Sequence, residues 1–155
     1  MDRLATMTYA VTGRVARITL DRPHRGNAIT FDMMISRNLR GFMSLFHGEK
    51  PVVCKVHGYC VAGGTDMALC SDLLVIEDKA KIGYPPARVW GSPTTAIWAY
   101  RIGLEKAKRL LFTGDSLSGE EAVAWGLATE AASRADLDAR AEALVERIAR
   151  HTREG

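Results

Sequence analysis

The chain has 155 residues and a formal net charge of +3, with 47% hydrophobic and 25% charged residues. This balance is that of a soluble globular protein, and the length suffices for one domain with its own hydrophobic core. Lysine and arginine are scattered rather than grouped, which argues against a nucleic-acid partner. No apolar run approaches the roughly 20 residues that cross a bilayer, and the first residues lack an apolar signal-peptide core, so we expect a cytoplasmic protein without membrane contact.

The first half of the chain predicts strands that alternate with helices. Two β-favouring runs joined at Gly13 and Arg14 predict a hairpin, and a loop rich in Pro and Gly follows. Helical spacing of apolar side chains then indicates a helix that Gly48 could end. The expected strands are 9–14, 15–20, 52–56 and 73–76, and the expected helices are 35–46 and 65–70.

The second half predicts four helices with recognisable start and stop residues. Capping side chains favour a helix start and glycine favours a helix end. The first helix is expected to start at Ser92-Pro93, to run to about residue 101 and to stop at Gly103, and the second, 104–112, is expected to end at Gly114. The third is expected to start at Ser118 with Glu121 and to end at Gly126, and residues 133–136 are expected to start the last. The last helix carries one apolar stripe, formed by Leu137, Ala141, Leu144 and Ile148. The alternation predicts an α/β fold with a largely parallel sheet.

The three cysteines, Cys54, Cys60 and Cys70, lie in one apolar stretch. Their odd number and the lack of a CxxC pair argue against a disulfide framework and against a metal site. Free cysteine is among the most frequently buried side chains. We therefore predict buried thiols, a reducing compartment and no metal.

The residues from Lys50 to Asp72 are the most informative part of the sequence. A buried strand runs into a glycine turn, Gly63-Gly64, which opens a helix with Asp66 in its first turn. The first N–H groups of a helix have no intrahelical partner and lie at the positive end of its dipole, which suits an oxyanion. Asp66 could act as a general acid or base beside it. The alternative is that the glycines only form a tight packing turn and that Asp66 only complements the helix dipole, a contribution of about 0.3–1 kcal/mol.

The order of motifs resembles the crotonase (enoyl-CoA hydratase/isomerase) superfamily. Its central signature is similar to Lys50-Pro51-Val52, Gly58-Tyr59, Ala62-Gly63-Gly64, Asp66, Ala68-Leu69 and Asp72. Further similar segments are Leu20-Asp21-Arg22-Pro23, Asn27-Ala28-Ile29, the strand-like 80–83, the helix 103–114, Glu121-Ala122 and Trp125-Gly126-Leu127. These matches run from about residue 9 to residue 150.

This resemblance implies a crotonase-like spiral of ββα units with C-terminal helices. Residues 1–133 would form the core and 134–155 the start of the C-terminal helical region. It implies an acyl-CoA substrate, with coenzyme A as part of the substrate and no separate cofactor, and a homotrimer or dimer of trimers. Gly63 matches the second oxyanion donor and Asp66 the first catalytic carboxylate of the hydratases. Arg25 resembles the basic residue often found near CoA before the Asn-Ala loop, with a solvated surface charge as the equal alternative. The other expected substrate-binding positions are Ala28, Gly64 and Tyr84.

The sequence departs from the family pattern in three places. The segment that carries the first oxyanion donor is absent, with a junction near Met33–Ile35, and the chain stops before further C-terminal helices. Either residues of a longer chain are missing here, or the protein is short; the first is favoured because losing central strands exposes sheet edges and core. Asp66 stands where hydratases carry Glu, so its reach is shorter by one methylene.

The third departure is Pro86, which occupies the position of the second hydratase carboxylate. Proline cannot transfer a proton, so the two-carboxylate hydration site is not intact, and isomerisation, hydrolysis or decarboxylation is equally compatible. Tyr84 and Arg88 are nearby polar candidates, although a packed Tyr and a solvated Arg are the plainer interpretation. The expected function is an acyl-CoA enzyme that stabilises a thioester enolate. The alternative is a non-catalytic acyl-CoA-binding or scaffold protein.

Overall fold

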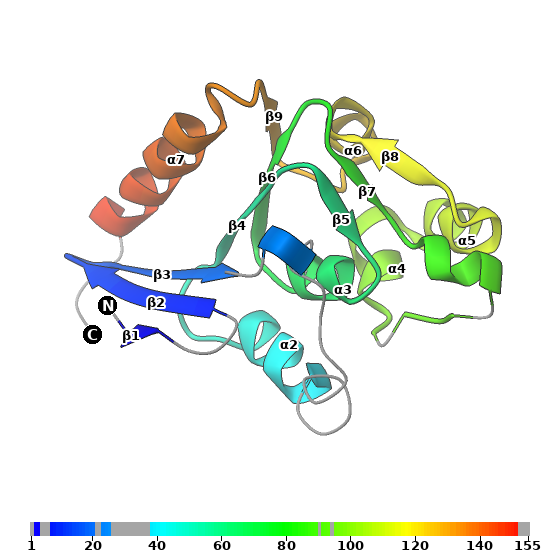
Figure 1. Cartoon of the computed structure of the whole chain (residues 1–155), viewed down its shortest axis with the longest axis horizontal. Helices are drawn as coiled ribbons and strands as arrows, with labels where there is room; N and C mark the ends of the chain where they lie inside the picture. Colours follow the sequence, from blue (N-terminus) through cyan, green and yellow to red (C-terminus); the bar gives the residue numbers. More distant parts are fainter. Residues whose placement is uncertain are drawn as a thin grey trace.

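The computed structural model describes residues 2–3, 7–20, 23–25, 38–89, 91–93 and 95–151. Small sheets and surrounding helices alternate through this part of the chain, which confirms the α/β class (Figure 1). The strands are β1 (Asp2–Arg3), β2 (Met7–Thr12), β3 (Val15–Leu20), β4 (Val53–Val56), β5 (Tyr59–Val61), β6 (Leu73–Glu77), β7 (Lys81–Gly83), β8 (Ser116–Ser118) and β9 (Glu130–Ala132). The helices are η1 (Pro23–Arg25), α2 (Asn38–Phe46), α3 (Gly63–Leu69), η2 (Pro85–Val89), α4 (Ile97–Ile102), α5 (Leu104–Thr113), α6 (Gly119–Trp125) and α7 (Leu137–His151).

The parallel pairing that the sequence predicts is divided between two three-stranded sheets. One has the order β4-β6-β9 and is parallel throughout. The other has the order β5-β7-β8, in which β5 and β7 are parallel and β8 is antiparallel to β7. Strands β5, β8 and β9 were not expected, because three residues are too few for the alternation of apolar and polar side chains to be recognised.

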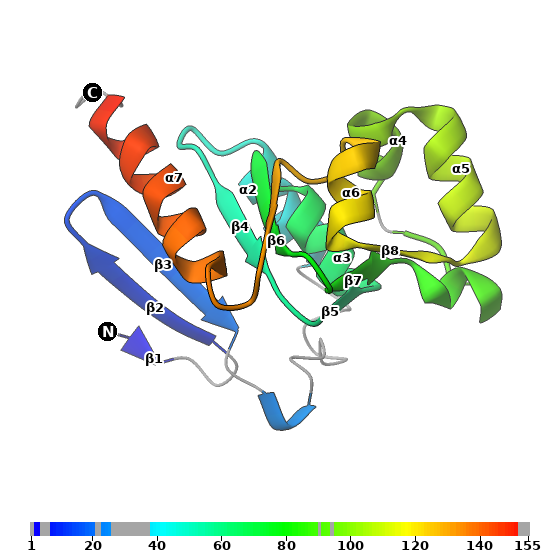
Figure 2. The same ribbon diagram turned by 90° about the horizontal axis from the view of Figure 1, so that it is seen from above.

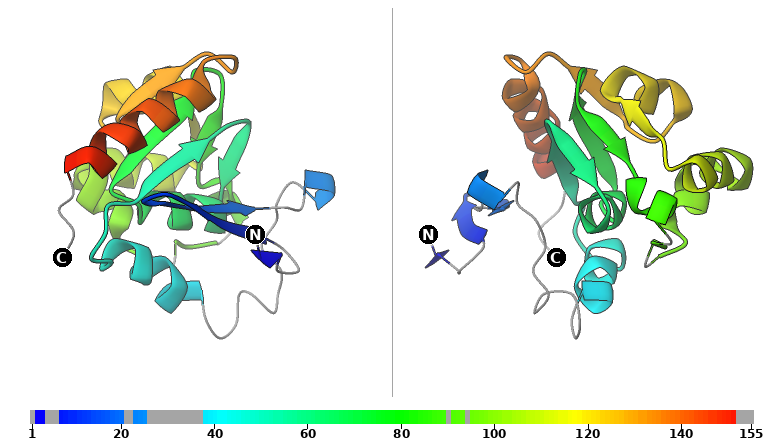
Figure 3. Two further views of the ribbon diagram at one scale, coloured as in Figure 1. Left: turned by 90° about the vertical axis from the view of Figure 1, so that its left-hand side faces the viewer. Right: turned by 45° about the vertical axis from the view of Figure 1, so that its right-hand side comes forward.

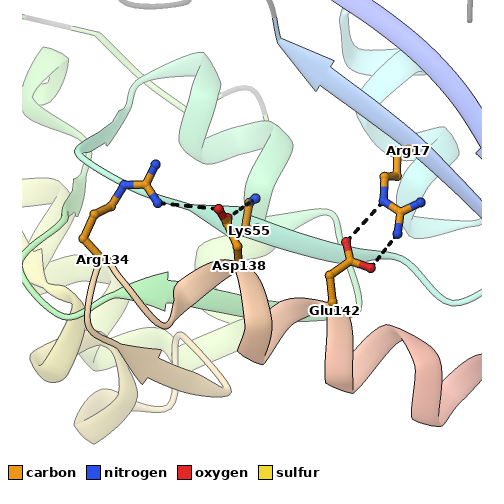
Figure 4. A network of polar contacts seen from close by, with 5 residues as sticks. All are labelled: Arg17, Lys55, Arg134, Asp138 and Glu142. Carbon is orange, nitrogen blue, oxygen red and sulfur yellow. Dashed lines mark hydrogen bonds and ion pairs between the residues drawn. The ribbon is translucent and has the colours of Figure 1, made fainter.

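The predicted hairpin is confirmed as β2 and β3, which pair antiparallel around Gly13 at a φ of 58°. The face that carries Arg17 is directed toward α7, where Arg17 forms an ion pair with Glu142 (Figure 4). The opposite face carries the cross-strand neighbours Tyr9 and Ile18, which are 40% and 62% exposed. Neither of the two hydrophobic clusters found among the described residues includes a residue of this hairpin.

Helix α7 closes one side of the β4-β6-β9 sheet, as Figures 1 and 2 show. Its predicted apolar stripe is confirmed, since Leu137 and Ala141 are buried against Val75 and Ala132. Polar contacts add to this packing: Lys55 of β4 hydrogen-bonds Asp138 and lowers the pKa of that carboxyl (Figure 4). None of the helices in the described ranges combines the length and apolarity that a membrane crossing requires.

The larger cluster of buried side chains surrounds α3 and holds it between the strands and α4. Its fully buried members include Leu69, Leu74, Ile76 and Ile82, with Trp98 only 1% exposed. Helix α2 lies beside α3 (Figure 3), and its Phe46 contacts Tyr100 of α4 edge to face at 5.4 Å between ring centroids. The core therefore fixes the helix on which the expected site residues lie.

The helix boundaries were predicted correctly where the signal is local. Ser118 accepts from the Glu121 N–H and Glu121 accepts from the Ser118 N–H, which is the expected capping box of α6. Gly114 ends α5 in the left-handed conformation at φ 67°. The predicted helix start at Ser92 and Pro93 is wrong, because α4 begins at Ile97. The Ser92 carbonyl accepts a hydrogen bond from the Tyr84 hydroxyl instead of from a helical N–H.

Candidate functional site

Strand β5 leads into α3 through a strained turn at Ala62. This residue has φ 55° and ψ −128°, and it is the non-glycine residue with positive φ in the described part of the chain. These are the angles of the first central position of a type II′ turn, which glycine adopts without a steric penalty. Such strain costs about 1–3 kcal/mol and concentrates at functional sites.

The turn directs the Gly63 N–H away from the helix. The Ala62 carbonyl points into α3, where it accepts from the N–H groups of Thr65 at 3.0 Å and Asp66 at 3.1 Å. In a trans peptide the N–H lies opposite the C=O, so the Gly63 N–H points outward. Within the described residues neither Gly63 nor Gly64 donates a backbone hydrogen bond. A Cβ on Gly64 would meet no atom within 4 Å, so the space around it is open.

Asp66 follows these glycines and is fully buried. Its charge acts on two neighbouring side chains. The pKa of the Cys70 thiol and that of the Tyr84 hydroxyl are both raised, with burial as the larger cause and the Asp66 charge as the smaller one. The structure thus places the expected carboxylate, the glycine turn and the end of β7 within one region.

Tyr84 directly follows β7 and is 6% exposed. Its hydroxyl donates a hydrogen bond to the Ser92 carbonyl oxygen at 2.8 Å, so its proton is engaged within the protein. Only the oxygen lone pairs of Tyr84 remain for a ligand, and its substrate-binding role stays a prediction. Arg88 binds the Thr113 carbonyl and the Asp115 carboxylate, at 3.1 and 2.9 Å, and its side chain is 60% exposed. These are the contacts of a surface arginine.

Comparison with known proteins decides the family. Residues 33–154 match the family model described as enoyl-CoA hydratase/isomerase. The chain belongs to this family. A Thermus thermophilus protein with the provisional name enoyl-CoA hydratase is 34% identical over 121 residues, which cover 74% of this chain and 48% of that protein. Carnitinyl-CoA dehydratase from Proteus mirabilis is 30% identical over 112 residues, covering 70% of this chain and 43% of the relative.

Solved structures confirm the crotonase-like fold. The crystal structure of an enoyl-CoA hydratase from Mycobacterium smegmatis has a TM-score of 0.88 and 43% identity, and the match covers 95% of this chain and 72% of that one. A Thermobifida fusca structure solved in complex with CoA has a TM-score of 0.85 at 22% identity, covering 96% and 80%, which shows the fold alone. This enoyl-CoA hydratase/isomerase family chain spans about half the length of the curated relatives it matches.

The departures from the family pattern fall partly inside the described structure. Pro86 lies in η2, whose residues carry no acidic side chain, and its carbonyl accepts from the Gly91 N–H at 2.8 Å. Arg25 ends η1, but its side chain lies outside the described residues, as do Ala28 and the junction near Met33–Ile35. Predictions that rest on these three remain predictions.

Two polar residues that hold α3 in place were not identified from the sequence. Thr65 is fully buried next to Asp66. Arg101 donates to the Leu69 carbonyl from Nε at 3.1 Å and Nη2 at 3.0 Å, and to the Asp72 carbonyl from Nη1 at 3.0 Å. These bonds satisfy carbonyls at the C-terminal end of α3, where a cation also complements the dipole. For Arg101, the only signal in the sequence was its place in the last turn of a predicted helix.

The cysteines are free thiols. Cys60 and Cys70 are buried and Cys54 is half-buried, which broadly confirms the predicted burial. Burial raises the pKa of Cys54 to about 11 and that of Cys60 to about 12, so both are protonated at neutral pH. In the part of the chain that the structure describes, no group of three or more His, Cys, Asp or Glu residues is arranged to hold a metal ion.

Proposed function

We propose that this protein binds the thioester group of an acyl-CoA at the turn before α3 and stabilises an enolate there. The observation that carries the proposal is the outward Gly63 N–H at the strained Ala62 turn. A preorganised backbone donor placed 2.7–3.1 Å from a developing oxyanion contributes roughly 10²–10³ in rate. Membership of a family whose relatives are named for CoA thioester chemistry supports the same substrate class.

In this mechanism Asp66 moves the proton. The carboxylate accepts the proton from the acyl α-carbon, the C–H electron pair becomes the C=C bond of the enolate, and the carbonyl electrons move to the thioester oxygen. The Gly63 N–H donates a hydrogen bond to that oxygen. Because Asp66 is fully buried, its basicity depends on the protein groups around it rather than on bulk water.

The proposed reaction subtype rests on the family resemblance at η2. Syn hydration with two carboxylates needs a second acid, and Pro86 stands at the matching position. A single carboxylate can remove and return a proton, which suits isomerisation or another enolate reaction. We further propose that coenzyme A enters only as part of the substrate, and that the protein is cytoplasmic and works as a homotrimer or dimer of trimers.

The second candidate is an acyl-CoA-binding protein without catalysis. The observation that favours it is the lack of an acidic side chain on η2, which leaves Asp66 as the one family carboxylate among the described residues. Binding would then use the Gly63 N–H while proton transfer is lost.

Binding and proton exchange measured on the same preparation distinguish these candidates. The intact mass of the purified chain is determined first, then butyryl-CoA binding by calorimetry, and deuterium uptake at its α-carbon by mass spectrometry. The enzyme proposal expects binding with exchange in the wild type and exchange lowered at least 100-fold in Asp66→Asn, with binding retained. Binding without exchange supports the second candidate, and no binding refutes both. Crotonyl-CoA is expected to remain unhydrated.

A further inference from the structure

One buried hydroxyl links the first turn of α3 to two strands. The Thr65 Oγ1 lies 2.9 Å from the carbonyl oxygen of Cys60 in β5 and 2.8 Å from that of Gly83 in β7. These strands are parallel neighbours, and Cys60 pairs with Ile82 in their register. A hydroxyl has a single proton, so Thr65 donates to one carbonyl at a time or shares the proton between both. Either way, its position is fixed against the middle of β5 and the end of β7.

No capping side chain defines the start of α3. The helix has seven residues, and a helix this short depends on tertiary contacts. Its N-cap, Ala62, makes no side-chain capping bond. Gly63 and Gly64 have no side chains to pack, and glycine is the residue with the greatest backbone freedom. Thr65 is therefore the first side chain that can anchor the turn.

We propose that Thr65 is a positioning residue for the candidate site. Resting on the proposed function, the inference is that its hydroxyl sets the direction of the Gly63 N–H and the distance of the Asp66 carboxylate from the substrate. Thr65 lies between these two groups in the chain, and the carbonyl of Gly83 that it contacts directly precedes Tyr84. The same bond therefore keeps the helix in register with the end of β7.

Loss of the hydroxyl changes geometry more than it changes packing. Valine fills nearly the same space as threonine but cannot donate to either carbonyl, whereas serine keeps the donor. Because a misplacement of about 1 Å can cost on the order of 100-fold in rate, we expect Thr65→Val to lower the kcat of α-proton exchange about 10- to 100-fold. Thr65→Ser is expected to keep the rate within about threefold of the wild type, since the hydroxyl donor remains.

Ser71 offers a matched control at the other end of the same helix. It is 2% exposed, and its hydroxyl lies 2.6 Å from the Ala68 carbonyl and 3.1 Å from the Leu73 carbonyl. Ser71→Ala also removes a buried hydroxyl that joins α3 to a strand. A purely structural role for Thr65 predicts that Thr65→Val and Ser71→Ala lose similar stability and similar activity.

The experiment measures urea unfolding, kcat and KM for α-proton exchange, and the infrared carbonyl stretch of bound butyryl-CoA labelled with ¹³C at the thioester. We expect only Thr65→Val to lower kcat and to weaken the shift of the carbonyl band, with both recovered in Thr65→Ser. Wild-type kcat and carbonyl shift in Thr65→Val would overturn the proposal, as would an equal loss in Ser71→Ala.

A failure of the proposed function leaves the inference testable. If the wild type neither binds nor exchanges butyryl-CoA, amide hydrogen exchange of Gly63 and Gly64 is compared among the same variants. Faster exchange in Thr65→Val than in Thr65→Ser and Ser71→Ala keeps Thr65 as the residue that orders the turn. Equal exchange in all variants rejects that role, independently of any activity.

Discussion

Replacing Ala62 by glycine is expected to stabilise the protein while it loosens the candidate site. Ala62 has φ 55° and ψ −128°, which glycine adopts without strain. Relief of backbone strain contributes roughly 1–3 kcal/mol, and the greater entropy of glycine in the unfolded chain takes back about 0.4–1 kcal/mol. The net gain is about 1 kcal/mol.

Urea denaturation is the direct assay for this gain. With an unfolding slope of about 1–3 kcal/mol per molar urea, a gain of about 1 kcal/mol raises the midpoint by about 0.3–1 M. The α-proton exchange rate of the same variant is expected to fall, since the Gly63 N–H is no longer held by a restricted neighbour.

Gly126→Ala is the matched reverse substitution, at the end of α6. Gly126 has φ 80°, and a Cβ there would meet no atom within 4 Å, so only backbone strain is added. We expect a loss of about 1 kcal/mol. If Gly126→Ala destabilises as expected while Ala62→Gly also lowers the midpoint, the strain assigned to Ala62 is refuted.

Three further outcomes are expected. Gly64→Ala should raise the unfolding free energy by about 0.5–1 kcal/mol, because alanine favours a helix over glycine, yet weaken butyryl-CoA binding in calorimetry because the methyl group enters open space at the turn; unchanged binding would place the ligand elsewhere. Arg101→Met should cost about 2–3 kcal/mol in urea unfolding by leaving the carbonyls at the end of α3 without a donor, and Arg101→Lys should recover only part of this. Desolvation raises the pKa values of the half-buried Cys54 and the buried Cys60 thiols from 9.0 to about 11 and 12, so the unfolded state releases their protons first and stability should fall as pH rises above 9; a slope unaffected by Cys60→Ala would contradict the burial of that thiol.

Local signals allowed the sequence to predict the helices of the second half. The capping box of Ser118 and Glu121 and the left-handed Gly114 involve residues close in the chain, so their chemistry can be recognised without the fold. Ser92 shows the limit of this approach, since Tyr84 uses its carbonyl and the helix begins later.

The candidate site was only partly predictable, because its support comes from residues distant in sequence. Gly63-Gly64 and Asp66 were identified from the glycine turn and from the family resemblance. The positive φ of Ala62 could not be expected of an alanine. Arg101 reaches Leu69 across 32 positions of the chain, and Thr65 meets β7 only after β5 and β7 have paired.

The arrangement of the β2–β3 hairpin has a consequence for how the molecule opens. The hairpin is joined to α7 by charged contacts, Arg17 to Glu142 and Arg14 to the Ala149 carbonyl, while Tyr9 and Ile18 face solvent. Salt screens exposed ion pairs but leaves buried apolar contacts almost unchanged. Rising ionic strength is therefore expected to weaken the contact between hairpin and α7, so that the hairpin opens more often than the core around α3. Hydrogen exchange of the β3 amides then detects an opening that a global denaturation curve does not resolve.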